Sequence, residues 1–199
     1  MNGRLVSSVA GLTLVAATVG CFFGIAGASP SHRAVAHPVA SHKAKPKAYH
    51  LTLAVLVSGP GTPKFTANGR SSALIDLPAN ATVDVTLRSF DDGPAAPPSV
   101  YSRVTGTVGG VMTLNGRKVR SVPVATIAHT FTVPGIGLNI PIPAVKGKAK
   151  FVTEAFQFKT GKAGKYAWQC YAPCGTGSAG WGGPMVTAGQ MMGEVQVGK

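Results

Sequence analysis

The residues best suited to metal chemistry lie in the second half of the chain. In the run Ile127–Val133, His129 has the same parity as the apolar residues. Alternate side chains of a strand share a face, so we expect His129 to point into the core. In Tyr166–Cys170, the same rule places Cys170 on the face of Trp168. A buried neutral imidazole and a thiolate, each near a strand end, are suitable ligands for copper.

Each of these residues also has a simpler interpretation. A single inward-facing histidine is commonly a hydrogen-bonded core residue. Cys170 and Cys174 are the cysteines that remain if residues 1–28 are removed. In an oxidising compartment, cysteines at this spacing predict a disulfide that closes a small loop. Both interpretations stay open on these residues alone.

Residues 1–28 have the three parts of a secretory signal. Arg4 precedes the uncharged apolar run Leu5–Ala28, which ends in the small residues Ala26-Gly27-Ala28. We expect cleavage after Ala28. The alternative is an uncleaved membrane anchor, because the run is long enough to span a bilayer. With either outcome, we expect the rest of the chain to lie outside the cytoplasm, secreted or associated with the cell envelope.

Residues 29–50 are expected to form a flexible basic linker, and residues 51–199 to form the folded domain. The linker has little to bury, and its histidines suggest weak metal capture: His32, His37, His42 and His50. The net charge of +13 falls by one if residues 1–28 are removed, because they contain one arginine and no acid. Such a charge favours anionic envelope surfaces, including peripheral membrane association, and acidic protein partners. Nucleic acid is not expected as a partner, because no basic helix or nucleic-acid motif is present.

From Tyr49 onward the chain resembles a series of short strands joined by turns. Asn115-Gly116 between two β-prone runs is a strong hairpin signal, and no window shows a helical period. The expected strands are 49–57, 73–77, 82–90, 111–114, 118–122, 126–133, 148–158, 165–170 and 191–197. Strands at this spacing predict an all-β, Greek-key β-sandwich.

Several segments between residues 62 and 197 resemble the cupredoxins, and among them the copper domain of cytochrome c oxidase subunit II and small blue-copper proteins. Those segments are Ala128–Pro134, Phe156–Phe158 with Gly164–Cys170, and Met191–Val195. They resemble, in that order, the family's first-histidine strand, the hairpin that ends in the cysteine ligand, and the methionine step into the last strand. The resemblance implies that His129 and Cys170 are equatorial ligands and that Met191 is the axial ligand. It likens Cys174 to the second bridging cysteine of a binuclear copper site.

The chain departs from this family at one ligand. No histidine follows His129, and Ser178 stands where the oxidase-like spacing puts the second imidazole. Met185 is the strong soft donor in the glycine-rich stretch 175–190, so we expect it to replace that histidine. The expected metal ligands are therefore His129, Cys170, Cys174, Met185 and Met191. Such a sulfur-rich set favours Cu(I) over Cu(II).

The resemblance implies an exported copper-binding protein that transfers electrons to a redox protein partner or holds Cu(I). The alternative is a metal-free structural or adhesive surface sandwich with a Cys170–Cys174 disulfide. An enzyme is not expected, because the chain shows no nucleophile elbow and no phosphate-binding glycine loop.

Overall fold

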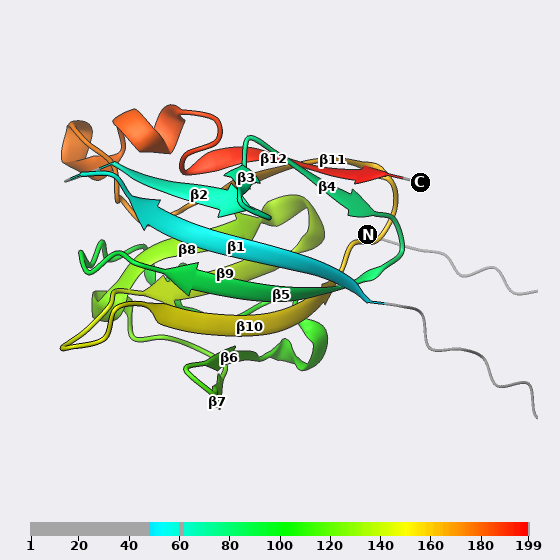
Figure 1. The fold of residues 1–199 in the computed structure, drawn as a ribbon, viewed down its shortest axis with the longest axis horizontal. Coiled ribbons are helices and arrows are strands. Elements are labelled where there is room, and N and C mark those ends of the chain that lie inside the picture. The colour runs from blue at the N-terminus through cyan, green and yellow to red at the C-terminus, as the bar shows by residue number, and fades with distance from the viewer. Residues whose placement is uncertain (1–47, 60–61, 199) are drawn as a thin grey trace, which may run out of the picture. The chain divides into compact units, whose positions relative to one another are not determined.

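We describe a computed structural model of the chain, which covers residues 48–59 and 62–198. These residues form two stacked β-sheets (Figure 1), so the predicted all-β sandwich is confirmed. The predictions for residues 1–28 and for most of the linker lie outside the described residues. The strands are β1 (Tyr49–Val57), β2 (Pro63–Ala67), β3 (Arg70–Ser71), β4 (Leu74–Pro78), β5 (Thr82–Ser89), β6 (Met112–Leu114), β7 (Arg117–Val119), β8 (Ile127–Val133), β9 (Leu138–Pro143), β10 (Val152–Lys159), β11 (Gly164–Gln169) and β12 (Met192–Gly198).

The two sheets are mixed, and each contains a single parallel pair. The larger has the order β3-β2-β1-β5-β10-β6-β7, and the smaller has the order β4-β12-β11-β8-β9. β1 runs parallel to β5 and β12 runs parallel to β4, while the other paired strands are antiparallel. β1 begins at Tyr49, so the last two residues of the expected linker are part of the larger sheet.

The core between the sheets follows the period of two in the sequence. In β1, Leu51, Leu53 and Val55 are buried while their neighbours are exposed or half-buried. β5 and β10 repeat this alternation. Removing these apolar faces from water is the main force that stabilises the sandwich.

β8 differs from this pattern, because all seven of its residues are buried. Its second face is covered by the long proline-rich segment that follows β5. Asn139 of β9 fixes this segment by donating hydrogen bonds to the carbonyls of Tyr101 (3.0 Å) and Arg103 (2.6 Å). Thr132 of β8 in turn donates to the Asn139 side-chain oxygen at 2.6 Å. The strand that carries His129 is therefore enclosed on both faces.

Two hairpins have the same two-residue turn. Asn115-Gly116 joins β6 to β7 with positive φ at both residues, as the sequence predicts. Asn68-Gly69 joins β2 to β3 with the same conformation. The sequence analysis did not predict β2 or β3, which are only five and two residues long.

The sequence pattern does not predict β9 either, because its sequence, LNIPIP, contains two prolines. Proline cannot donate a hydrogen bond within a sheet and is tolerated at the edge of one. β9 is the edge strand of the smaller sheet. Among residues 48–59 and 62–198, no helix is long and apolar enough to cross a membrane.

Glu154 of β10 is an unusual residue of the core. Its side chain is fully buried, and neither carboxylate oxygen has a hydrogen-bond partner among the described residues. Burial therefore raises the pKa of Glu154 well above its ordinary value. The folded protein therefore favours the protonated carboxyl, whereas the unfolded chain ionises it freely.

We expect Glu154→Gln to remove a pH dependence of stability. Above the ordinary pKa near 4.5 the native state binds more protons than the unfolded state, so wild-type stability falls as pH rises. The loss approaches about 1.4 kcal/mol per pH unit until the folded-state pKa is reached. Thermal melts of both proteins between pH 5 and pH 9 should therefore diverge, with the glutamine variant the more stable at high pH. Parallel melting curves would show that Glu154 ionises in the folded protein.

Candidate metal centre

The candidate site lies where β8 meets the loop between β11 and β12. β8 carries His129, Cys170 directly follows β11, and Cys174 lies four residues further on. Met185 lies on the short 3-10 helix η6 (Gly183–Val186). Figure 1 shows this loop, in orange, at the end of the sandwich opposite the start of β1 and the end of β12.

Four of the predicted ligands come together here. One ligand atom each from His129, Cys170 and Cys174 lies within 4.8 Å of the others. Cys174 Sγ lies 3.5 Å from Cys170 Sγ and 3.4 Å from Met185 Sδ. His129, Cys170 and Met185 are at most 1% exposed. The result is a compact group of one imidazole and three sulfurs.

The two ring nitrogens of His129 have different surroundings. Nε2 lies 2.9 Å from Asp91 Oδ2, and the imidazole is fully buried. Nδ1 is also buried and has no hydrogen-bond partner among the described residues. A carboxylate that accepts from one ring nitrogen leaves the other available as a metal ligand. The predicted inward orientation of His129 is confirmed, but the ring is not fully satisfied as a core histidine would be.

Cys170 is held by main-chain contacts. The Thr130 N–H donates to its Sγ at 3.3 Å, and the Cys170 N–H donates to the Met191 carbonyl at 2.9 Å. Met191 is fully buried, as its parity predicts, and its main chain lies beside the site. The distances given above join the other four predicted ligands and do not involve the Met191 thioether.

The Asp91 carboxylate and the His129 ring each stabilise the charged form of the other. Burial raises the pKa of the Asp91 carboxyl, but hydrogen bonds from His129 and from the Gly93 N–H outweigh burial and bring the pKa below its ordinary value. Burial lowers the pKa of His129, but the hydrogen bond to Asp91 and the nearby sulfur of Cys170 outweigh burial and raise the pKa to about 9.

The pKa values of the two cysteines shift in opposite directions. Burial raises the pKa of Cys170, but the hydrogen bond from Cys174 and the nearby His129 ring bring it well below its ordinary value. The hydrogen bond to Cys170, followed by burial, raises the pKa of Cys174. These shifts favour the thiolate at Cys170 and the thiol at Cys174.

The loop that carries Met185 depends on glycines with no room for a side chain. A Cβ atom at Gly175 would overlap the Gly182 carbonyl oxygen and would lie 2.8 Å from Met185 Cγ. A Cβ at Gly182 would lie 2.5 Å from the Thr176 carbonyl oxygen. These close approaches fix the path of the loop and the position of the thioether.

We expect Gly175→Ala to disturb the loop through atomic overlap and not through backbone strain, because Gly175 does not have a positive φ. The added methyl should move Met185 and lower the free energy of unfolding by about 1–3 kcal/mol, as overpacking does. Gly59→Ala is the matched control, since its Cβ would meet nothing nearer than 3.5 Å. Chemical denaturation of both variants measures the difference. Equal stability would mean that the loop adapts to the extra carbon.

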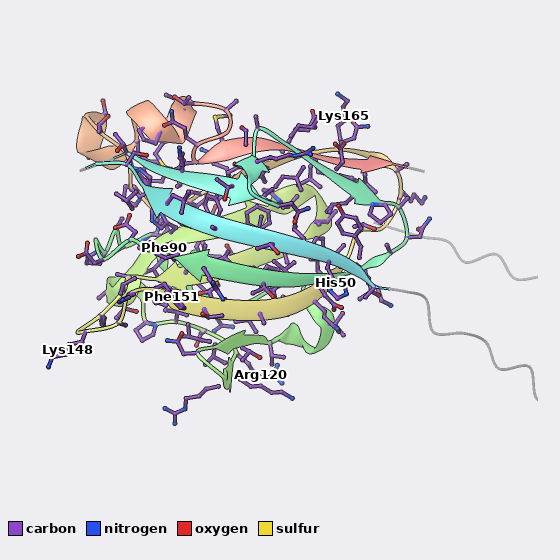
Figure 2. The ribbon with its side chains drawn as sticks, viewed as in Figure 1. His50, Phe90, Arg120, Lys148, Phe151 and Lys165 are labelled. Atoms are coloured by element: carbon purple, nitrogen blue, oxygen red, sulfur yellow. The ribbon has the colours of Figure 1, made fainter. Side chains whose placement is uncertain are left out.

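Other predicted residues lie elsewhere. Ser178, where the resemblance puts a second imidazole, is exposed in the loop. His50 is an exposed residue of β1, 3.7 Å from Asp84, and Figure 2 shows it at the far end of the strand. The sequence analysis missed Asp91 as a site residue. Asp91 accepts from the Gly93 N–H at 2.8 Å, as an aspartate in a turn does, and its second oxygen reaches His129.

Comparison with known proteins finds likeness only among solved structures. No protein-family model matches the chain, and no curated protein matches it. Rusticyanin from Thiobacillus ferrooxidans is 19% identical, with 75% of this chain and 76% of that chain covered and a TM-score of 0.37. Reduced rusticyanin is 19% identical over the same shares, with a TM-score of 0.41. A histidine-to-methionine variant of rusticyanin is 20% identical over the same shares, also with a TM-score of 0.41.

A two-sheet sandwich with mixed strand order places an inward histidine on β8 beside cysteines that follow β11. This chain is a two-sheet β-sandwich with a His/Cys/Cys group that could hold a metal ion.

Proposed function

We propose that this protein binds a Cu(I) ion through His129, Cys170, Cys174 and Met185. The observation that carries the proposal is the buried, unpartnered Nδ1 of His129 beside the two cysteine sulfurs. Leaving a buried polar atom without a partner is costly, and such an atom in a native site needs an explanation. A bound metal ion would supply the missing partner, while Asp91 holds the opposite nitrogen.

The chemistry of the donors selects the reduced ion. Thiolate and thioether are soft donors, and they suit Cu(I) better than Cu(II). Met185, whose sulfur lies against Cys174, takes the place of the absent second histidine. We propose Met191 as an additional donor, because its main chain is bonded to Cys170 and its side chain is buried. Bound copper would serve as a cargo ion or as a one-electron centre.

Anaerobic titration of the reduced protein with Cu(I) against a competing chelator tests the proposal. We expect about one equivalent to bind tightly, because the site has a single imidazole and no second set of donors around it. Copper should protect both thiols from alkylation. The alternative, a metal-free surface module, predicts a quantitative Cys170–Cys174 disulfide that copper does not change. The two sulfurs lie 3.5 Å apart here, as free thiols rather than at the roughly 2.05 Å of a disulfide.

Electron transfer is a second candidate, and a pair of tyrosines favours it. Tyr171 directly follows Cys170, and its ring stacks on Tyr101 with centroids 4.4 Å apart and planes 6° apart. Both rings are half-buried, so they form an aromatic contact between the buried thiolate and the surface. A redox protein partner would then exchange electrons here. Voltammetry tests this: a reversible copper couple supports electron transfer, and irreversible loss of copper on oxidation supports holding alone.

We also propose an extracytoplasmic location, supported by the signal-like pattern of residues 1–28. The mature protein should begin at Ser29, and a sequence that starts at residue 1 or 2 would instead indicate an anchor. Anionic envelope surfaces remain the proposed non-specific partner. Lys148 extends away from the sandwich in Figure 2 and can contact such a surface, whereas the Arg120 guanidinium donates to the carbonyls of Gly109 and Gly110.

A further inference from the structure

A surface pocket opens directly above the metal centre. It has a volume of about 680 Å³, which falls in the range of small-molecule sites. Its walls are mixed in polarity: Val57, Pro63, Pro94 and Pro173 are apolar, and Asp91 and Cys174 also line it. The pocket is therefore lined by one cysteine of the metal centre and by the aspartate that orients His129.

The four donors are not equally accessible from this pocket. His129 and Cys170 are fully buried, and Met185 is 1% exposed. Cys174 is half-buried and is the donor among these four that lines the pocket. An outside ligand must therefore meet Cys174 first, while the other three donors stay enclosed by protein.

We propose that Cys174 is the exchange ligand of the site and that the pocket admits a small thiolate-bearing molecule, which delivers or removes Cu(I) there. This inference rests on the proposed function. In removal, a bond forms between the incoming thiolate and Cu(I), the bond from Cu(I) to Cys174 breaks, and the Cys174 sulfur takes up a proton. Copper stays Cu(I) throughout, so no oxidant or reductant is required. A thiolate suits this role because it can compete with a sulfur-rich donor set.

The first test uses the metal-free protein. A small mercurial such as methylmercury, which displaces the proton of a thiol, should modify Cys174 far faster than the fully buried Cys170. Ser58, an exposed residue of the pocket wall, provides the variant Ser58→Trp, whose ring would fill part of the pocket. We expect this variant to slow Cys174 labelling about tenfold, the effect of a modest added barrier. Ser99→Trp, at an exposed serine outside the pocket, is the matched control and should label like wild type.

The second test uses Cu(I)-loaded protein and free cysteine as the acceptor. The rate of copper transfer should rise with cysteine concentration and fall about tenfold in Ser58→Trp, while equilibrium affinity stays unchanged. Transfer that is independent of cysteine concentration, or equal in both tryptophan variants, would overturn the inference. Absence of Cu(I) binding in the wild type would instead overturn the proposed function, and the labelling result would still report on access to Cys174.

Discussion

His129→Ala and Cys170→Ser should each weaken Cu(I) binding by on the order of a hundredfold. Four-donor structural metal sites contribute roughly 10–16 kcal/mol, or about 3 kcal/mol per donor, and every 1.4 kcal/mol is tenfold in affinity. Each variant removes a fully buried donor that no other described residue can replace. Chelator competition under anaerobic conditions measures the loss.

Met185→Leu serves as the comparison for these two variants. Leucine keeps the volume of the buried thioether, so the fold should be retained. A thioether is a weaker donor than a thiolate, and we expect a loss of about tenfold or less. Circular dichroism of all three variants separates a lost ligand from a lost fold. If folded His129→Ala and Cys170→Ser bind Cu(I) as tightly as wild type, the site has been assigned to the wrong residues.

Asp91→Asn should weaken Cu(I) binding by about 10- to 100-fold, although Asp91 is not a ligand. The carboxylate accepts from His129 Nε2–H, so that Nδ1 is the nitrogen that loses its proton and offers a lone pair to the metal. An asparagine that keeps its acceptor on the Gly93 N–H would turn its amide donor toward Nε2. The proton would then sit on Nδ1, where it blocks the metal position. Asp76→Asn, at an exposed acid on β4, is the matched control.

A pH profile distinguishes this positioning role from simple destabilisation. Because the pKa of His129 is raised to about 9, the metal-free imidazole is charged at neutral pH and must lose a proton when copper binds. The rise of apparent affinity with pH that comes from His129 should therefore end at about pH 9. Asp91→Asn removes a hydrogen bond that raises this pKa, so this step of the profile should move to lower pH. A variant that only unfolds part of the protein would lower the Cu(I) affinity without changing the pH at which that affinity rises.

The strand pattern and the inward residues could be predicted from the sequence, because each depends on local periodicity. The alternation in Ile127–Val133 fixes the direction of His129, and the burial of Cys170 and Met191 follows from the same rule. The burial of the opposite face of β8 could not be predicted. It depends on a segment from a distant part of the chain, which Asn139 holds in place.

The parts of the site that lie in loops were harder to predict. Asp91 stands in a turn, where an aspartate usually caps a main-chain N–H, and its second contact joins residues 38 positions apart. Met185 was expected as a ligand because of its chemistry and not because of any spacing. Its contact with Cys174 depends on the close main-chain approach at Gly175, which only the folded loop reveals.

X-ray absorption at the copper edge of the Cu(I)-loaded protein identifies the atoms that bind the copper. We expect sulfur to outnumber nitrogen among them, with one imidazole nitrogen from His129 and sulfurs from Cys170, Cys174 and Met185. In Cys170→Ser the sulfur contribution should fall or the copper should be lost. Copper surrounded by nitrogen and oxygen alone, or copper retained unchanged in Cys170→Ser, would show that these residues are not its ligands.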